Sequence, residues 1–108
     1  MNQLNSIILE GNIVAVEVGN SGVDFTISVY RSYKNCEGHT VEDVSEFHCY
    51  AYGNLAKSVE QFGKIGRGVR CVGRLKQTVW EQGGKKCSSV GVVCEHIEFK
   101  PFVEKKGD

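Results

Sequence analysis

The sequence predicts an all-β fold, a small closed barrel of five strands with one helix between the third and fourth strands. Most segments of the 108-residue chain alternate apolar and polar side chains with the period of two expected of a half-buried strand. One short segment, after the third strand pattern, has helical spacing instead. The composition, 41% hydrophobic and 24% charged, is that of one ordinary globular domain.

The first three strands are predicted at residues 6–16, 23–33 and 46–52. The first reads "SIILEGNIVAV" and is rich in β-branched residues, which favour strands. The other two alternate, and we expect their apolar sides to form the core. These core residues are Phe25, Ile27 and Val29 in the second strand and Phe47, Cys49 and Ala51 in the third.

The helix is predicted at residues 54–62, "NLAKSVEQF", where the apolar residues recur at helical spacing. Asn54 is a plausible N-cap, because its side-chain oxygen accepts from the first free amides of a helix. Gly63 follows the last apolar residue and is a plausible stop.

The fourth and fifth strands are predicted at residues 68–80 and 88–99, with Val69, Cys71, Leu75 and Val79 on the apolar side of the fourth. Gly73 and Gly91 lie inside these patterns, where glycine often marks a bulge or a sharp bend. Loops are expected at 17–22, 34–45 and 81–87. Three strands, a helix and two strands are the order of the OB-fold, a five-stranded Greek-key barrel. We expect this domain at residues 1–100 and a short tail at 101–108.

Several classes of protein do not fit. The chain has no apolar run of about 18 residues and no basic, apolar leader, so neither a membrane span nor a signal peptide is predicted. Its five cysteines are an odd set without a CxxC pair, which favours a reducing cytoplasm over a disulfide framework. The histidines lack metal-ligand spacing, "GKIGRG" (63–68) lacks the phosphate-loop pattern, and no nucleophile–base pair is recognisable. We therefore predict no metal, no cofactor and no enzyme.

The net charge of zero hides a segregation of charge along the chain. Residues 1–60 carry 3 basic and 8 acidic side chains, a net of −5, whereas residues 61–90 carry 7 basic and 1 acidic, a net of +6. Residues 91–108 carry 3 and 4, a net of −1, which restores zero. A local basic stripe can bind a polyanion even when the whole protein is neutral.

Aromatic and basic residues share the predicted solvent faces of three strands. They are Tyr30, Tyr33 and Lys34 on and after the second strand, His48, Tyr50 and Tyr52 on the third, Arg70, Arg74, Lys76, Thr78 and Trp80 on the fourth, and Lys85 and Lys86 across the turn. Bases of an unpaired strand stack on such rings at roughly 1–3 kcal/mol each while Lys and Arg follow the phosphates. A single tyrosine is more often a half-buried packing residue, and Trp80 could equally cap the barrel or fill an interface. The combination of rings and cations on neighbouring strands predicts a surface for single-stranded nucleic acid.

The chain also resembles a known family, the bacterial-type single-stranded DNA-binding proteins. The resemblance runs from "LNSIILEGNIV" (4–14) to "VGVVCEHIEF" (90–99), and its most specific parts are "YGNLA" (52–56) and "VRCVGRLKQTVW" (69–80). It implies a non-enzymatic, sequence-tolerant single-stranded DNA-binding protein of replication, recombination or repair, located in the cytoplasm with the nucleoid. The stacking aromatics of the family fall on Tyr33, Tyr52 and Trp80, and its basic residues fall on Lys34, Arg74 and Lys76. The family usually assembles as a homotetramer through its first strand and barrel faces, and we expect a homo-oligomer here, a tetramer ahead of a dimer, with Ile7, Ile8, Leu9 and Glu10 at the interface.

The chain departs from the family pattern at several points. A family aromatic near the start of strand three has Phe47 as its nearest equivalent, and alternation places Phe47 in the core. Tyr33 has the parity of the core residues, so it reaches DNA only if its strand outruns the barrel or bulges. Asn54 stands where a basic residue is common.

Typical members also end in a long disordered tail with an acidic, Phe-terminated tip that recruits replication and repair enzymes, whereas this chain stops at "FVEKKGD". We expect either a tailless relative or a truncated chain. Two alternatives stay open: a tailless primosomal-type accessory protein that mainly holds other proteins, and an OB module that binds protein or oligosaccharide.

Overall fold

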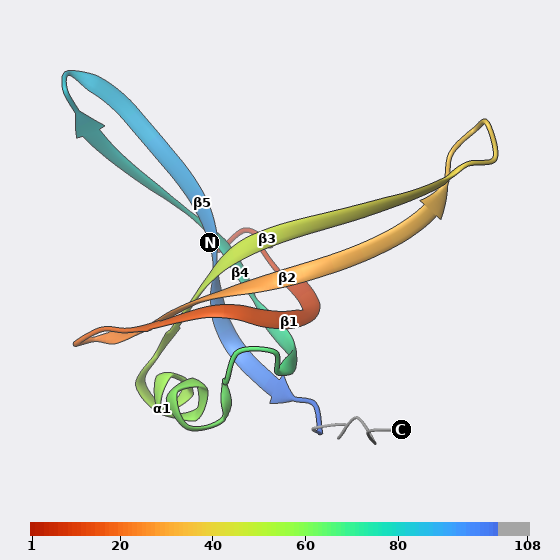
Figure 1. The fold of residues 1–108 in the computed structure, drawn as a ribbon. Coiled ribbons are helices and arrows are strands. Elements are labelled where there is room, and N and C mark those ends of the chain that lie inside the picture. Colours follow the sequence, from red (N-terminus) through yellow and green to blue (C-terminus); the bar gives the residue numbers. More distant parts are fainter. Residues whose placement is uncertain (102–108) are drawn as a thin grey trace.

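The computed structural model describes residues 1–101 and confirms the predicted closed barrel with one helix (Figure 1). Its elements are β1 (Ile7–Val18), β2 (Gly22–Lys34), β3 (Thr40–Tyr52), α1 (Gly53–Phe62), β4 (Gly68–Gln82) and β5 (Lys85–Phe99). The strands follow the order β1-β2-β3-β5-β4 around the barrel, which closes because β4 also pairs with β1. Only β3 and β5 pair in parallel among these strands. The predicted tail, apart from Pro101, lies outside the described residues.

The core lies inside the barrel and is built from the inward side chains of all five strands. Its fully buried members include Ile13, Phe25, Ile27, Cys49, Val69 and Cys71. The helix covers one end of this core with Ala56 and Val59, and it ends at Gly63 as predicted. The prediction of Asn54 as N-cap is wrong, because the helix begins at Gly53 with Tyr52 at the cap position and no side-chain cap. No helix within residues 1–101 is long and apolar enough to cross a membrane.

Two hairpins extend well beyond the barrel (Figure 1). β2 pairs with β1 only as far as Ser28 but with β3 as far as Lys34, and this extension, residues 29–46, is named the β2–β3 arm. β4 pairs with β1 only as far as Gly73 but with β5 as far as Gln82, and residues 74–91 are named the β4–β5 arm. The two arms leave the barrel in diverging directions, on the side away from α1.

The arms correct two sequence predictions of loops. Most of residues 34–45 and 81–87 continue the strands, and the β4–β5 turn is only Gly83 and Gly84. Both glycines have positive φ, 58° and 80°, as the tightest hairpin turns require. An arm has water on both faces, so its strands need no alternation of apolar and polar residues, and residues 40–46 show none.

The core is also smaller than the sequence predicted. Phe47, Leu75 and Val79 have the parity of core residues but remain 40%, 45% and 56% exposed. The period of two determines which side of a strand a residue faces, but the barrel interior does not extend behind every residue of that side. The β4–β5 register shifts between Val72 and Gly73, beside the glycine predicted to mark a bulge or a bend, but the extra residue is Glu95 of β5. No such shift occurs at Gly91.

Candidate nucleic-acid interface

The even-numbered residues of β4 form a row along one face of the β4–β5 arm. Arg74, Lys76, Thr78 and Trp80 are all exposed, and Trp80 keeps 42% of its surface in water. Their cross-strand partners on β5 are mostly small: Gly91 opposite Lys76, Ser89 opposite Thr78 and Cys87 opposite Trp80. Since these neighbours cannot cover the row, the indole and the cations are open to a ligand. After the turn, Lys85 adds an exposed cation to this face, whereas the exposed Lys86 lies opposite Glu81 on the other face of the arm.

Tyr50 of β3 lies against the root of this row. A Cβ added to Gly91 would meet Cε2 of the Tyr50 ring at 2.4 Å and Cζ at 3.2 Å, so the ring rests directly on the glycine. Gly91 is the partner of Lys76, which places the half-buried ring beside the cation row. The glycine inside the strand pattern was the sequence signal for this contact. Gly91 is needed for close packing of the Tyr50 ring and not for a bulge.

The other outward residues of β3 continue the surface across the barrel. Tyr52, 53% exposed, packs one edge of its ring against Gly22, where an added Cβ would lie 2.8 Å from Cδ1. His48 is exposed, and its Nδ1 lies 3.3 Å from Thr26 Oγ1. β3 thus presents three ring side chains on its outward face, one of them adjoining the cations of the β4–β5 arm.

The β2–β3 arm carries the remaining predicted aromatics, but on two different faces. The Tyr30 hydroxyl donates to Glu42 Oε1 at 3.1 Å, and the ring is exposed. Tyr33 has the parity of core residues, but its ring is exposed because β2 runs beyond the barrel, as its access to DNA requires. The guanidinium of Arg31, which we did not single out from the sequence, lies 5.6 Å from the Tyr33 ring centroid. Lys34 ends the strand and is exposed.

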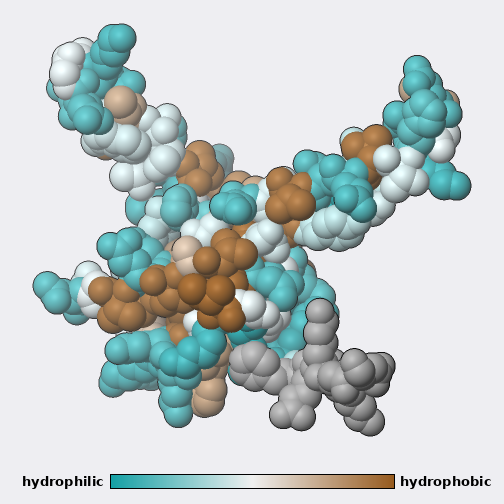
Figure 2. All heavy atoms as spheres, in the orientation of Figure 1, coloured by the Kyte–Doolittle hydropathy of each residue, from teal (hydrophilic) through white to brown (hydrophobic). Residues whose placement is uncertain are grey.

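Charge distinguishes the two arms. Residues 30–46 contain two cations, Arg31 and Lys34, against four carboxylates, Glu37, Glu42, Asp43 and Glu46. Residues 74–90 contain four cations against Glu81 alone. A polyanion is therefore attracted chiefly to the β4–β5 arm. Figure 2 shows hydrophilic side chains at the ends of both arms and apolar ones nearer the barrel.

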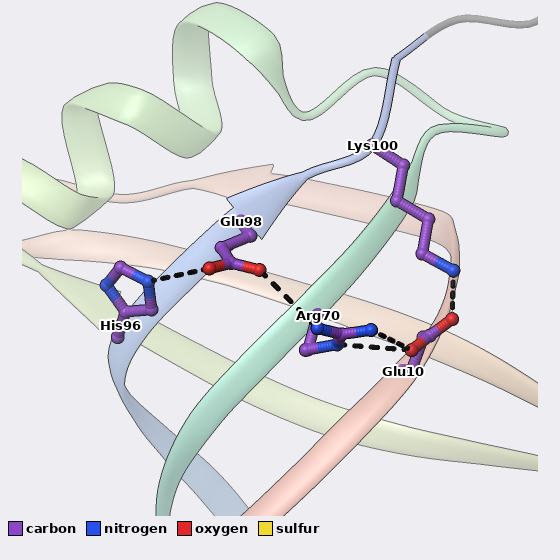
Figure 3. Close-up of polar contacts among 5 residues, drawn as sticks. All are labelled: Glu10, Arg70, His96, Glu98 and Lys100. Atoms are coloured by element: carbon purple, nitrogen blue, oxygen red, sulfur yellow. Dashed lines mark hydrogen bonds and ion pairs between the residues drawn. The ribbon is translucent and has the colours of Figure 1, made fainter.

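Arg70 belongs to a separate group of charges on β1, β4 and β5 (Figure 3). Its Nη2 and Nε donate to Glu10 Oε2 at 3.1 and 3.2 Å, and its Nη1 lies 3.7 Å from Glu98 Oε2. Lys100 also donates to Glu10, and the hydrogen bonds from Lys100 and Arg70 hold the pKa of that carboxyl below its usual range. Neighbouring carboxylates therefore compensate the charge of Arg70, unlike the cations of the arm.

The predicted interface residues of β1 alternate between two environments. Leu9 is buried in the core and Ile7 packs against it, whereas Ile8 is 69% exposed. Glu10 lies on the same outward face as Ile8 and binds Arg70 and Lys100. Only Ile8 and Glu10 therefore offer their side chains to a neighbouring molecule.

The cysteines supply no site. Cys49 and Cys71 are buried, as their strand faces predicted, Cys94 is buried too, and none of the five cysteines forms a disulfide within residues 1–101. The hydrogen bond to Cys94, together with burial, raises the pKa of the Cys49 and Cys71 thiols. Over the described range, no three His, Cys, Asp or Glu side chains are placed to hold a metal ion.

Comparison with known proteins gives concordant matches. The model of the single-strand binding protein family matches residues 4–100. The single-stranded DNA-binding protein of Aquifex aeolicus is 35% identical over 103 residues, covering 89% of this chain and 69% of that protein. The single-stranded DNA-binding protein of Fusobacterium nucleatum is 26% identical over 102 residues, covering 89% of this chain and 66% of that protein. This chain thus spans about two thirds of the length of these relatives.

A solved structure shares the fold. The Plasmodium falciparum SSB, solved in complex with ssDNA, superposes with a TM-score of 0.82 at 14% identity, covering 94% of this chain and 98% of that one. At this identity the likeness establishes the OB-fold barrel alone.

Proposed function

Because the chain belongs to the single-strand binding protein family, we propose that it binds single-stranded DNA without sequence preference in replication, recombination or repair. One observation of the structure carries the proposal: Tyr50 joins the aromatic face of β3 to the cation row that ends in Trp80. Single-strand binding needs this combination, because the rings stack on bases of any identity and the cations follow the phosphates.

The strand path follows from this surface. Bases stack on Tyr52, Tyr50 and Trp80, each contact being worth roughly 1–3 kcal/mol. Arg74 and Lys76 neutralise phosphates between the barrel and the indole. Lys85 and Lys86 do so beyond it, and His48 and Thr78 supply hydrogen bonds. A duplex buries its base faces, so this surface favours unpaired strands.

The β2–β3 arm supplies the second part of the path. Tyr33, backed by Arg31 and followed by Lys34, forms a further stacking position. Tyr30 contributes less, because Glu42 holds its hydroxyl and adds negative charge. Arg70 also contributes less to phosphate binding, since Glu10 and Glu98 compensate it. We assign binding rather than catalysis to this surface. We also propose that the protein works in the cytoplasm with the nucleoid, where free thiols persist.

Assembly is the second part of the proposal. We expect a homotetramer in which the outward face of β1 contributes to the subunit contacts. Ile8, exposed and paired across the sheet with Val72, gives this face an apolar centre, and the Glu10–Arg70 ion pair lies beside it. An assembly brings several binding surfaces to one strand and raises its avidity without new contacts.

Titration of fluorescently labelled oligo-dT and of a matched duplex, followed by anisotropy, tests the function. We expect tight binding of oligo-dT and far weaker binding of the duplex, with the affinity for oligo-dT falling as salt rises. Equal binding of the duplex, or no binding of oligo-dT at low salt, would refute the proposed function.

A further inference from the structure

A short segment before β1 extends the contact between β1 and β4 to the root of the β4–β5 arm. The backbone pairing of these strands ends at Ile7 opposite Gly73. Two residues farther out, the side chain of Asn5 takes the place of a strand. Its Nδ2 donates to the Leu75 carbonyl at 2.7 Å, and the Leu75 amide donates to its Oδ1 at 3.0 Å. The carboxamide thus satisfies both backbone groups of Leu75 on that edge of the arm.

On the opposite edge of the arm, β3 and its Tyr50 ring contact β5 at nearly the same level. Leu75 pairs with Val92, and the following pair is Lys76 with Gly91, on which the Tyr50 ring rests. The backbone pairing of β3 with β5 is confined to this level, at Cys49 with Val92 and Tyr50 with Val93. Asn5 and Tyr50 therefore contact the arm from its two sides at consecutive residue pairs, where it leaves the barrel.

We propose that Asn5 is a positioning residue for the DNA site. By holding Leu75, it fixes the angle of the arm so that Trp80 and the barrel ring Tyr50 face the same strand. This inference rests on the proposed function, because it assigns Asn5 a role in that site.

The geometry shows why a small change at the root matters. Trp80 lies five residues beyond Leu75, or about 17 Å at about 3.4 Å per residue. A tilt of about 10° at the root therefore moves the indole by about 3 Å, close to the rise of roughly 3.4 Å between successive bases of a strand. Beyond the barrel the arm has no core behind it, and such an element deforms at low free-energy cost. The two hydrogen bonds of Asn5 therefore bias the position of the arm, and we do not expect the barrel to need them to fold.

The test substitutes Asn5→Ala in the full chain without an N-terminal tag, with Asn2→Ala as the matched control in the same segment. We expect Asn5→Ala to weaken oligo-dT binding roughly three- to tenfold, the usual cost of losing preorganisation at one contact. The control should bind as the wild type does. Both variants should keep the melting temperature of the wild type, because both side chains are exposed.

A double-mutant cycle with Trp80→Ala distinguishes a role of Asn5 in placing Trp80 from a general effect of the substitution on DNA affinity. If Asn5 acts by placing Trp80, Asn5→Ala should cost clearly less in the Trp80→Ala background, where only the cations of the arm remain to be misplaced. An equal loss in both backgrounds, or wild-type affinity of Asn5→Ala, would overturn the inference. If Asn5→Ala melts below the assay temperature, Asn5→Asp replaces it. That variant keeps the acceptor for the Leu75 amide but loses the donor and adds a negative charge, so Asn2→Asp is its charge-matched control; affinity equal to that of Asn2→Asp would overturn the inference.

Hydrogen exchange distinguishes failure of this inference from failure of the proposed function. Exchange at the Leu75 amide should accelerate in Asn5→Ala but not in Asn2→Ala, whether or not DNA binds. If the wild type does not bind oligo-dT, the proposed function fails while the exchange result still reports on the contact. If the wild type binds and Asn5→Ala matches it, only the positioning role fails.

Discussion

Salt dependence should identify which cations follow the DNA backbone. The perturbation is a pair of double substitutions in the β4–β5 arm, Arg74→Gln with Lys76→Gln at its root and Lys85→Gln with Lys86→Gln at its tip. For a single strand, log K falls with log salt by about 0.7 per phosphate neutralised. The root pair removes two charges without a carboxylate partner, so it should reduce the slope by up to about 1.4, whereas the tip pair should reduce it less because Lys86 lies opposite Glu81.

The control pair removes the same charge from another part of the molecule. Lys57 and Lys64 are exposed on α1 and just after it, and α1 lies on the side of the barrel away from the arms (Figure 1). Lys57→Gln with Lys64→Gln should leave the slope within error of the wild type. Anisotropy of labelled oligo-dT over roughly a tenfold range of salt measures all the slopes. Unchanged slopes in both arm variants, or an equal drop in the control, would refute the assignment of phosphate contacts to the arm.

Three further outcomes are expected. Ile8→Asp should break the assembly without unfolding the subunit, because the side chain is exposed, and sedimentation equilibrium showing an unchanged oligomer would exclude this face as an interface. Since Lys100 and Arg70 lower the pKa of Glu10, its carboxylate stabilises the fold above its ordinary pKa, and this contribution disappears as the pH falls through the lowered value. Glu10→Gln should therefore lower the melting temperature at neutral pH and not in strong acid, and an equal effect at both would contradict the ion-pair role. Cys36, exposed at the tip of the β2–β3 arm, should react with a thiol reagent in the native protein while the three buried cysteines remain protected, and rapid labelling of all five would contradict the packed core.

Much of the fold could be predicted from the sequence because barrel strands have one dry face and one wet face. Phe25, Ile27 and Cys49 alternate with polar residues, and the structure buries all three. The helix stop at Gly63 was also predictable, whereas the N-cap was not. Propensity favoured the side chain of Asn54, but the chain turns into the helix one residue earlier, at Gly53, whose φ is +60°.

The length of the arms and the reach of the core could not be predicted from a period of two. Beyond the barrel, strand pairing depends on backbone hydrogen bonds and turn geometry, and residues 40–46 carry no apolar alternation to reveal it. For the same reason Phe47 and Leu75 have core parity but no core behind them. Of the site, the row ending in Trp80 followed from the sequence. Contacts between distant segments did not: Asn5 lies 70 residues from Leu75, and no local pattern joins them.

The central claim is that DNA bases stack on the exposed indole of Trp80, and the emission of this residue tests it most directly because it is the only tryptophan of the chain. Adding oligo-dT should strongly quench the intrinsic emission, and the free Trp80→Ala variant should melt as the free wild type does. Trp80→Ala should then weaken binding by roughly 1–3 kcal/mol, the cost of losing one stacking position. Unchanged emission on saturation with oligo-dT, together with wild-type affinity of Trp80→Ala, would contradict the account.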